Sequence, residues 1–202
     1  EGVGRIHWST DRGSIITFRT SDGAVEWIHE LDGPSSTGLR DHLVEERAAG
    51  VSLRRSGARL FASAPGSSRI TILDAESGKS LGVIAANAPR CWNISSDGES
   101  LLVVEESEVV LWNCREGTVP GFKWHAPLPM PLTGSGSDIV PSVDGGWWIG
   151  TGDALLSFDA TGQHQTIQGL DLPAHSLQSI GDTLLAAAGS DGLPEILRSS
   201  VC

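Results

Sequence analysis

Three acidic residues lie close together near the middle of the chain, Glu105, Glu106 and Glu108. Their carboxylates are oxygen ligands of the kind that Ca²⁺ takes, about six to eight at a time, in a compact loop. Acids that alternate around one short turn do not provide such a loop by themselves. The spacing therefore favours a solvated turn, and a divalent cation such as Ca²⁺ is the alternative.

Histidine, serine and glycine form no catalytic motif along the chain. The six histidines contain neither a His-x-x-x-His nor a His-x-His pair, so zinc coordination is poorly supported. His7 and His29 flank strands of the same repeat and could come close to one another. The nucleophile elbow Gly-x-Ser-x-Gly and the phosphate-binding P-loop are both absent. The sequence thus favours a protein without enzymatic activity.

The charge balance argues against two classes of partner. Lys and Arg number 14 against 25 Asp and Glu, which gives a formal net charge of −11. An acidic surface repels the phosphates of nucleic acids and the headgroups of anionic membranes. No apolar run reaches the roughly 18 residues of a membrane-spanning helix, so neither nucleic acid binding nor membrane insertion is expected.

The cysteines and the N-terminus leave the compartment unresolved. Cys91, Cys114 and Cys202 are too few for a disulfide framework. Cys91 and Cys114 either pair across neighbouring strands or stay as buried free thiols, and the second alternative is favoured. Residue 1 is Glu, and no charged segment followed by an apolar stretch marks a signal peptide. We expect a soluble chain.

An internal sequence repeat predicts the strands and turns that position these residues. A short apolar strand, a polar turn with Gly and a second apolar strand recur, and Asp-Gly and Ser-Gly provide the positive φ that tight hairpins require. The copies begin near Ile6, Val51, Cys91, Asp138 and Ser176, so that they are 45, 40, 47 and 38 residues apart. A period of roughly 40–45 residues with several strands per unit is typical of a β-propeller.

The repeats predict an all-β fold with about five four-stranded blades in a single domain over residues 1–202. The last repeat is short of a fourth strand and the first begins abruptly, so part of a larger propeller is the alternative. The segment RDHLVEERAA at 40–49 is either one short helix or an outer strand. Two loops, at 33–38 and 126–137, lie between repeats.

Three repeats resemble known propeller blades. SSDGESLLVVEESEVVLWNCREG, at 95–117, resembles a WD40 blade, with Trp112-Asn113 at the place of the structural Trp-Asp pair. ITILDAESGKSLG, at 70–82, and DGAVEWIHEL, at 22–31, resemble quinoprotein-type repeats. The resemblance covers most of the chain and implies a β-propeller in which Trp112 belongs to the core. It implies no particular function.

A third resemblance bears on catalysis. VDGGWWIGTGDALLSFDATGQ, at 143–163, is similar to repeats of the lactonase-type propellers. That resemblance implies that their metal-binding Glu corresponds to Glu1 and their catalytic Asp to a position near Glu105. It also implies that their metal-binding Asn falls near Arg90. A cation where a metal ligand should lie argues against the lactonase activity.

The first functional hypothesis is therefore a non-catalytic scaffold that binds another protein, either alone or as a subunit of a larger assembly. Its candidate contacts are Trp124 and His125 beside the Pro-rich loop, although Trp124 could instead pack between two blades. Trp147 and Trp148 are further weak candidates; they are adjacent and point to opposite faces of a strand, so one is expected in the core and the other either at a blade-to-blade contact or exposed. The alternatives are a metal-dependent hydrolase with its site at the channel mouth and a carbohydrate-binding propeller whose Trp side chains stack on sugars.

Overall fold

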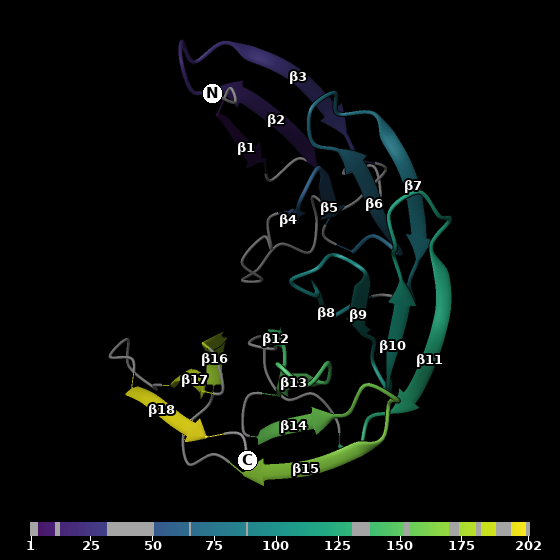
Figure 1. Ribbon diagram of the computed structural model, residues 1–202, viewed down its shortest axis with the longest axis vertical. Helices are drawn as coiled ribbons and strands as arrows, with labels where there is room; N and C mark the ends of the chain where they lie inside the picture. The colour runs from purple at the N-terminus through teal and green to yellow at the C-terminus, as the bar shows by residue number, and fades with distance from the viewer. Residues whose placement is uncertain are drawn as a thin grey trace, which may run out of the picture. The chain divides into compact units, whose positions relative to one another are not determined.

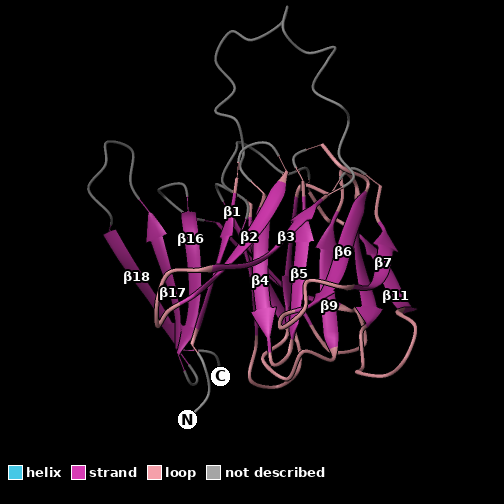
Figure 2. Ribbon diagram, turned by 90° about the horizontal axis from the view of Figure 1, so that it is seen from above, coloured by secondary structure: helices cyan, strands magenta, loops and turns pink. Residues whose placement is uncertain are grey.

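The computed structural model describes residues 4–10, 13–31, 51–64, 66–87, 89–130, 138–151, 154–169, 174–180, 183–188 and 195–200. Within these ranges the chain forms strands and turns and contains no helix (Figure 2). The predicted helix or strand at 40–49 and the loop at 33–38 lie outside the described residues. In the part that is described, no helix is long and apolar enough to cross a membrane.

The strands form five antiparallel sheets, each a meander in which neighbours in the chain pair with one another (Figure 1). Sheet 1 contains β1 (Arg5–Ser9), β2 (Ser14–Arg19) and β3 (Val25–Glu30). Sheet 2 contains β4 (Ser52–Ser56), β5 (Arg59–Ser63), β6 (Arg69–Asp74) and β7 (Ser80–Ala85). Sheet 3 contains β8 (Cys91–Ile94), β9 (Ser100–Val104), β10 (Glu108–Asn113) and β11 (Gly121–Pro127).

Sheet 4 contains β12 (Asp138–Pro141), β13 (Trp147–Gly150), β14 (Ala154–Phe158) and β15 (His164–Gly169). Sheet 5 contains β16 (Ala174–Ile180), β17 (Thr183–Ala188) and β18 (Glu195–Ser200). Four-stranded antiparallel meanders of this kind are the blades of a propeller. The predicted all-β propeller fold is confirmed, with three four-stranded and two three-stranded sheets among the described residues.

The register shows which strands of the sheets correspond. In each four-stranded sheet the pairing shifts between the third and fourth strands, for example between Ile72 and Leu73 where β6 meets β7. The same shift occurs between Thr17 and Phe18, where β2 meets β3. Sheet 1 therefore consists of the counterparts of strands two to four. Sheet 5 has no shift between β17 and β18 and consists of the counterparts of strands one to three.

The chain divides into two compact units, Glu1–Ala88 and Pro89–Cys202. In the first unit the apolar side chains of sheets 1 and 2 share one core, which consists of Ile15, Val51, Leu60, Ala62, Leu73 and Ala75. In the second unit sheets 3 and 4 share a larger core around Trp147 and Phe158, and β12 packs beside both β8 and β16. Each fully buried Leu, Ile or Phe stabilises such a core by about 1.5–3 kcal/mol.

Candidate functional site

Trp124, a predicted binding residue, packs against the neighbouring sheet of its own unit. It lies on the outer strand β11, and its indole Nε1 donates a hydrogen bond of 3.1 Å to the carbonyl oxygen of Ala160. The ring lies over the turn between β14 and β15, so closely that a Cβ on Gly162 would be 2.7 Å from Trp124 Cδ2. The structure thus places Trp124 between two blades, which is the packing alternative that the sequence left open.

His125, the next residue, faces solvent on the other side of β11. Its side chain is 64% exposed, and its Nδ1 lies 2.8 Å from Oε2 of Glu108 on the paired strand β10. The ring of Phe122 lies 5.8 Å from that of His125, and the ring of Trp112 contacts Phe122 edge to face at 6.3 Å. These four residues, Glu108, Trp112, Phe122 and His125, form what we call the β11 patch.

The β11 patch exposes apolar surface that none of the described residues covers. Phe122 is 59% exposed, and Val119, at the start of the same edge, is 89% exposed. Single exposed apolar residues are common on proteins, but an aromatic residue beside a His–Glu pair offers both apolar area and directional hydrogen bonds. Aromatic residues are enriched at the centre of protein interfaces, whereas polar pairs are typical of the rim.

Trp147 and Trp148 lie in different cores on opposite faces of β13. Trp147 is 2% exposed and packs with Phe158 between sheets 3 and 4, so it is inaccessible to a partner. Trp148 is half-buried and packs against the second core of this unit, with Val140, Leu155, Leu177 and Leu184. Both rings are therefore required for blade packing.

The acidic residues considered for metal binding lie in different environments and do not form one site. Glu105 is buried, Glu106 is exposed, and Glu108 bonds to His125. Glu1 lies outside the described residues. Within the described ranges, no three His, Cys, Asp or Glu side chains gather in a way that could hold a metal ion.

Cys91 and Cys114 do not form a disulfide with one another. Burial raises the pKa of the Cys91 thiol to about 12, and the nearby carboxylate of Asp138 adds to the shift. The thiolate is the nucleophilic form of cysteine, so at neutral pH Cys91 is an unreactive part of the packing. Cys202 lies outside the described residues.

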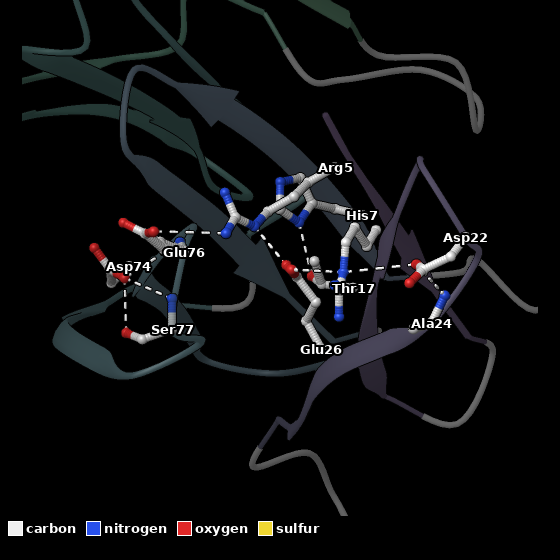
Figure 3. Close-up of polar contacts among 10 residues, drawn as sticks. Arg5, His7, Thr17, Asp22, Ala24, Glu26, Asp74, Glu76 and Ser77 are labelled. Atoms are coloured by element: carbon white, nitrogen blue, oxygen red, sulfur yellow. Dashed lines mark hydrogen bonds and ion pairs between the residues drawn. The ribbon is translucent and has the colours of Figure 1, made fainter. Parts of the chain in front are cut away.

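A polar network that the sequence analysis did not anticipate joins sheet 1 to the turn between β6 and β7 (Figure 3). Arg5 pairs with Glu26 on β3 at 2.5 Å and with Glu76 in that turn at 3.5 Å. Arg19 also approaches Glu26, at 3.5 Å. Residues 5, 19 and 26 come together only through the strand register, so no local motif could have shown the network.

His7 lies beside this network and does not pair with His29. Its Nδ1 is 2.8 Å from Oγ1 of Thr17 (Figure 3). Its ring lies 5.9 Å from that of Trp27. His29 is paired with Ile15 on β2. Burial lowers the pKa of His7, and the charges of Arg55 and Arg5 lower it further. A neutral imidazole within a packed sheet is consistent with a structural role.

Solved structures with the same arrangement of strands show the class of fold. BamB from Moraxella catarrhalis superposes with a TM-score of 0.64 at 17% identity, over 99% of this chain and 60% of that one. A chain of the mitotic checkpoint complex gives 0.66 at 12% identity, over 93% and 55%. The β-propeller domain of Cps50 (Swd1) from Myceliophteria thermophila gives 0.62 at 15% identity, over 90% and 59%.

The chain therefore has the β-propeller fold, as the repeats predicted. It spans less than two thirds of the length of each of these three chains. No family model and no curated protein matches the sequence.

Proposed function

We propose that this chain is a non-catalytic β-propeller module that binds another protein through the β11 patch and acts as a subunit of a larger assembly. The observation that carries the proposal is the exposed pair of Phe122 and His125, with the half-buried Trp112 against Phe122 and the carboxylate of Glu108 against His125. The likeness to a chain of the mitotic checkpoint complex supports a scaffold role, since that protein works within a complex.

The chemistry of the patch indicates what the partner presents. Phe122 offers an apolar side chain that would enter a pocket, because burying it removes its exposed area from water. The Glu108–His125 pair offers an acceptor carboxylate and a ring nitrogen at the edge of that contact. The partner thus presents an apolar pocket rimmed by hydrogen-bond donors, and basic donors would also complement the acidic surface of this chain.

The experiment compares the full chain with a double variant, Phe122→Ala with His125→Ala, as bait in extracts of the source cells. Partners quantified by mass spectrometry are then purified, and their Kd for each bait is measured. Hot-spot residues contribute on the order of 2 kcal/mol or more each, so we expect at least a tenfold weaker Kd for the double variant.

Val143→Ala is the control, because Val143 is 64% exposed on the turn between β12 and β13 and is not one of the residues of the β11 patch. It should bind as the unchanged chain does. Equal binding by all three proteins would refute the β11 patch as the contact. Stoichiometric bound metal with hydrolase activity, or glycan binding that survives the double variant, would instead favour the enzyme or the carbohydrate-binding propeller.

A further inference from the structure

The outer strand β7 forms one edge of sheet 2 and leaves part of its backbone without a partner strand (Figure 1). Ala86 N donates a hydrogen bond of 2.9 Å to Ser68 O, and the pairing with β6 then continues residue by residue through Ala85 to Val83. Hydrogen-bonded and non-hydrogen-bonded positions alternate along an antiparallel pair. The N–H and C=O groups of Val83 and Ala85 therefore point away from β6, to the side where no described strand pairs with β7.

One face of this edge strand is apolar and exposed. Leu81 is 54% exposed, Val83 is 48% exposed, and Ala85 is exposed as well. These three residues alternate with Gly82 and the buried Ile84, so they share a face of the sheet. The bulge where β6 meets β7 comes before Gly82, so that the strand is regular from there to Ala85. Free backbone groups in line with apolar side chains are what a further strand requires in order to pair.

The strand β7 lacks the side chains that protect other outer strands from pairing with another chain. Lysine and other charged side chains, and proline, are the usual means by which proteins prevent edge-to-edge association. The outer strand β3 carries Glu26 and Glu30, β11 carries Lys123 and ends in Pro127, and β15 is polar (HQTIQG). The sequence of β7, SLGVIA, contains neither a charged residue nor a proline. Among the described outer strands, β7 is therefore the one best suited to accept another strand.

The same strand is complementary to a second copy of itself. If two copies of β7 pair antiparallel about a two-fold axis at Val83, each Val83 donates its outward N–H to the C=O of the other. That axis also brings Leu81 opposite Ala85 of the second copy, so that a large apolar side chain meets a small one. An axis at Ala85 would instead leave Leu81 beyond the end of the opposite strand. Because β7 is uncharged, the pairing brings no like charges of the two strands together.

We propose that the chain forms a symmetric dimer in which β7 pairs with β7 of a second copy about an axis at Val83, so that sheet 2 continues from one copy into the other. The same surface meets itself in such an interface, which therefore closes at two chains. A contact made mainly by one strand pair lies at the low end of interface sizes, below about 1,200 Å² in total, where complexes are weak. The surface is distinct from the β11 patch, and the inference does not depend on the proposed function.

The first test is sedimentation equilibrium of the full chain over a range of concentrations. We expect a Kd between about 1 μM and 1 mM, which is the range of weak complexes. The mass should rise with concentration from that of the monomer toward twice that value and stop there. Amide hydrogen exchange at Val83 should slow as the dimer forms, because its outward N–H becomes hydrogen-bonded.

Two variants at the axis test the register. Val83→Lys and Val83→Glu each place two like charges directly opposite one another, which destabilises a strand pair. Each variant alone should therefore dimerise at least tenfold more weakly than the unchanged chain. An equal mixture of the two variants places opposite charges across the axis, so the mixture should associate at least tenfold more tightly than either variant alone. This recovery requires that Val83 meets its own copy.

Val143→Lys is the control, because Val143 is also an exposed valine and lies on the turn between β12 and β13. It should dimerise as the unchanged chain does. The side chain of Val83 is exposed, so the melting temperature of each variant, measured at a concentration at which the chain is monomeric, should equal that of the unchanged chain. Equal melting temperatures separate lost pairing from lost folding.

Three results would overturn the proposal. A mass that stays at the monomer value up to about 1 mM would mean that β7 does not pair with a second copy. A mass that grows beyond that of a dimer would mean an open contact between different surfaces. Self-association that survives both Val83 variants, or a mixture of the two variants that does not associate, would mean that the contact lies elsewhere.

Discussion

At the scale of single residues, one contact between blades is a Trp ring that packs on a glycine in a turn of the next blade. Ala at a position of positive φ costs about 1–2 kcal/mol by itself. At Gly78 and Gly162 the added methyl group would also overlap an indole ring, whereas at Gly23 it would meet no described atom within 4 Å. All three glycines have a positive φ, of 69° at Gly23, 68° at Gly78 and 87° at Gly162, and they differ in what covers them, so that their alanine variants can be compared.

We predict that Gly78→Ala and Gly162→Ala each destabilise the chain by about 1–3 kcal/mol more than Gly23→Ala does, since displacing a packed ring adds to the backbone cost. Urea unfolding of the three variants of the full chain measures this. Equal losses of unfolding free energy at all three positions would contradict this prediction, because they would show that contacts with the Trp rings do not stabilise the turns.

At the scale of elements, aspartates cap the turns that lead to the outer strands. Oδ1 of Asp74 accepts hydrogen bonds from the hydroxyl and backbone N–H of Ser77, both at 2.7 Å. Oδ1 of Asp159 accepts from the hydroxyl and N–H of Thr161 at 2.7 and 2.8 Å. Hydrogen bonds from these hydroxyls, and then from the backbone, lower the pKa of both carboxyl groups.

We predict that these caps make the chain sensitive to acid. Their folded-state pKa values lie below the unfolded value of about 3.9, so the carboxylates stabilise the fold above that pH. The stabilisation is lost as the pH falls from about 4 through the folded-state pKa. The double variant Asp74→Asn with Asp159→Asn should therefore be less stable than the unchanged chain at pH 7. Its stability should also fall less as the pH is lowered. Thermal melts between pH 7 and pH 2 would measure both effects. A fall as steep as that of the unchanged chain would contradict this assignment.

The sequence alone predicted the kind of elements but not the contacts between them. The Gly turns and apolar alternation predicted the all-β propeller, because hairpin geometry is encoded locally in residues such as Asp22-Gly23. The role of Trp124 could not be decided, since its partner Gly162 is brought to it only by blade packing. Phe122 was missed because a single apolar residue in a strand gives no sign of whether its face is covered.

At the scale of the whole molecule, the net charge of −11 shapes what the chain can bind. We predict that it does not bind duplex DNA at 150 mM salt, because binding of that kind depends on basic residues that displace counterions. Fluorescence anisotropy with a labelled duplex tests this. Binding that weakens steeply with added salt would contradict this prediction. It would indicate a local basic surface on a chain whose net charge is negative.

The central claim is that this propeller is a protein-binding module whose contact is the β11 patch. The most direct measurement is hydrogen–deuterium exchange of the full chain, alone and in complex with the partner captured by it. We expect slower amide exchange in the complex across β10 and β11, around Glu108 and Phe122. Exchange in the turn at Val143 should be the same with and without the partner. Unaltered exchange in β10 and β11 together with protection elsewhere would contradict it.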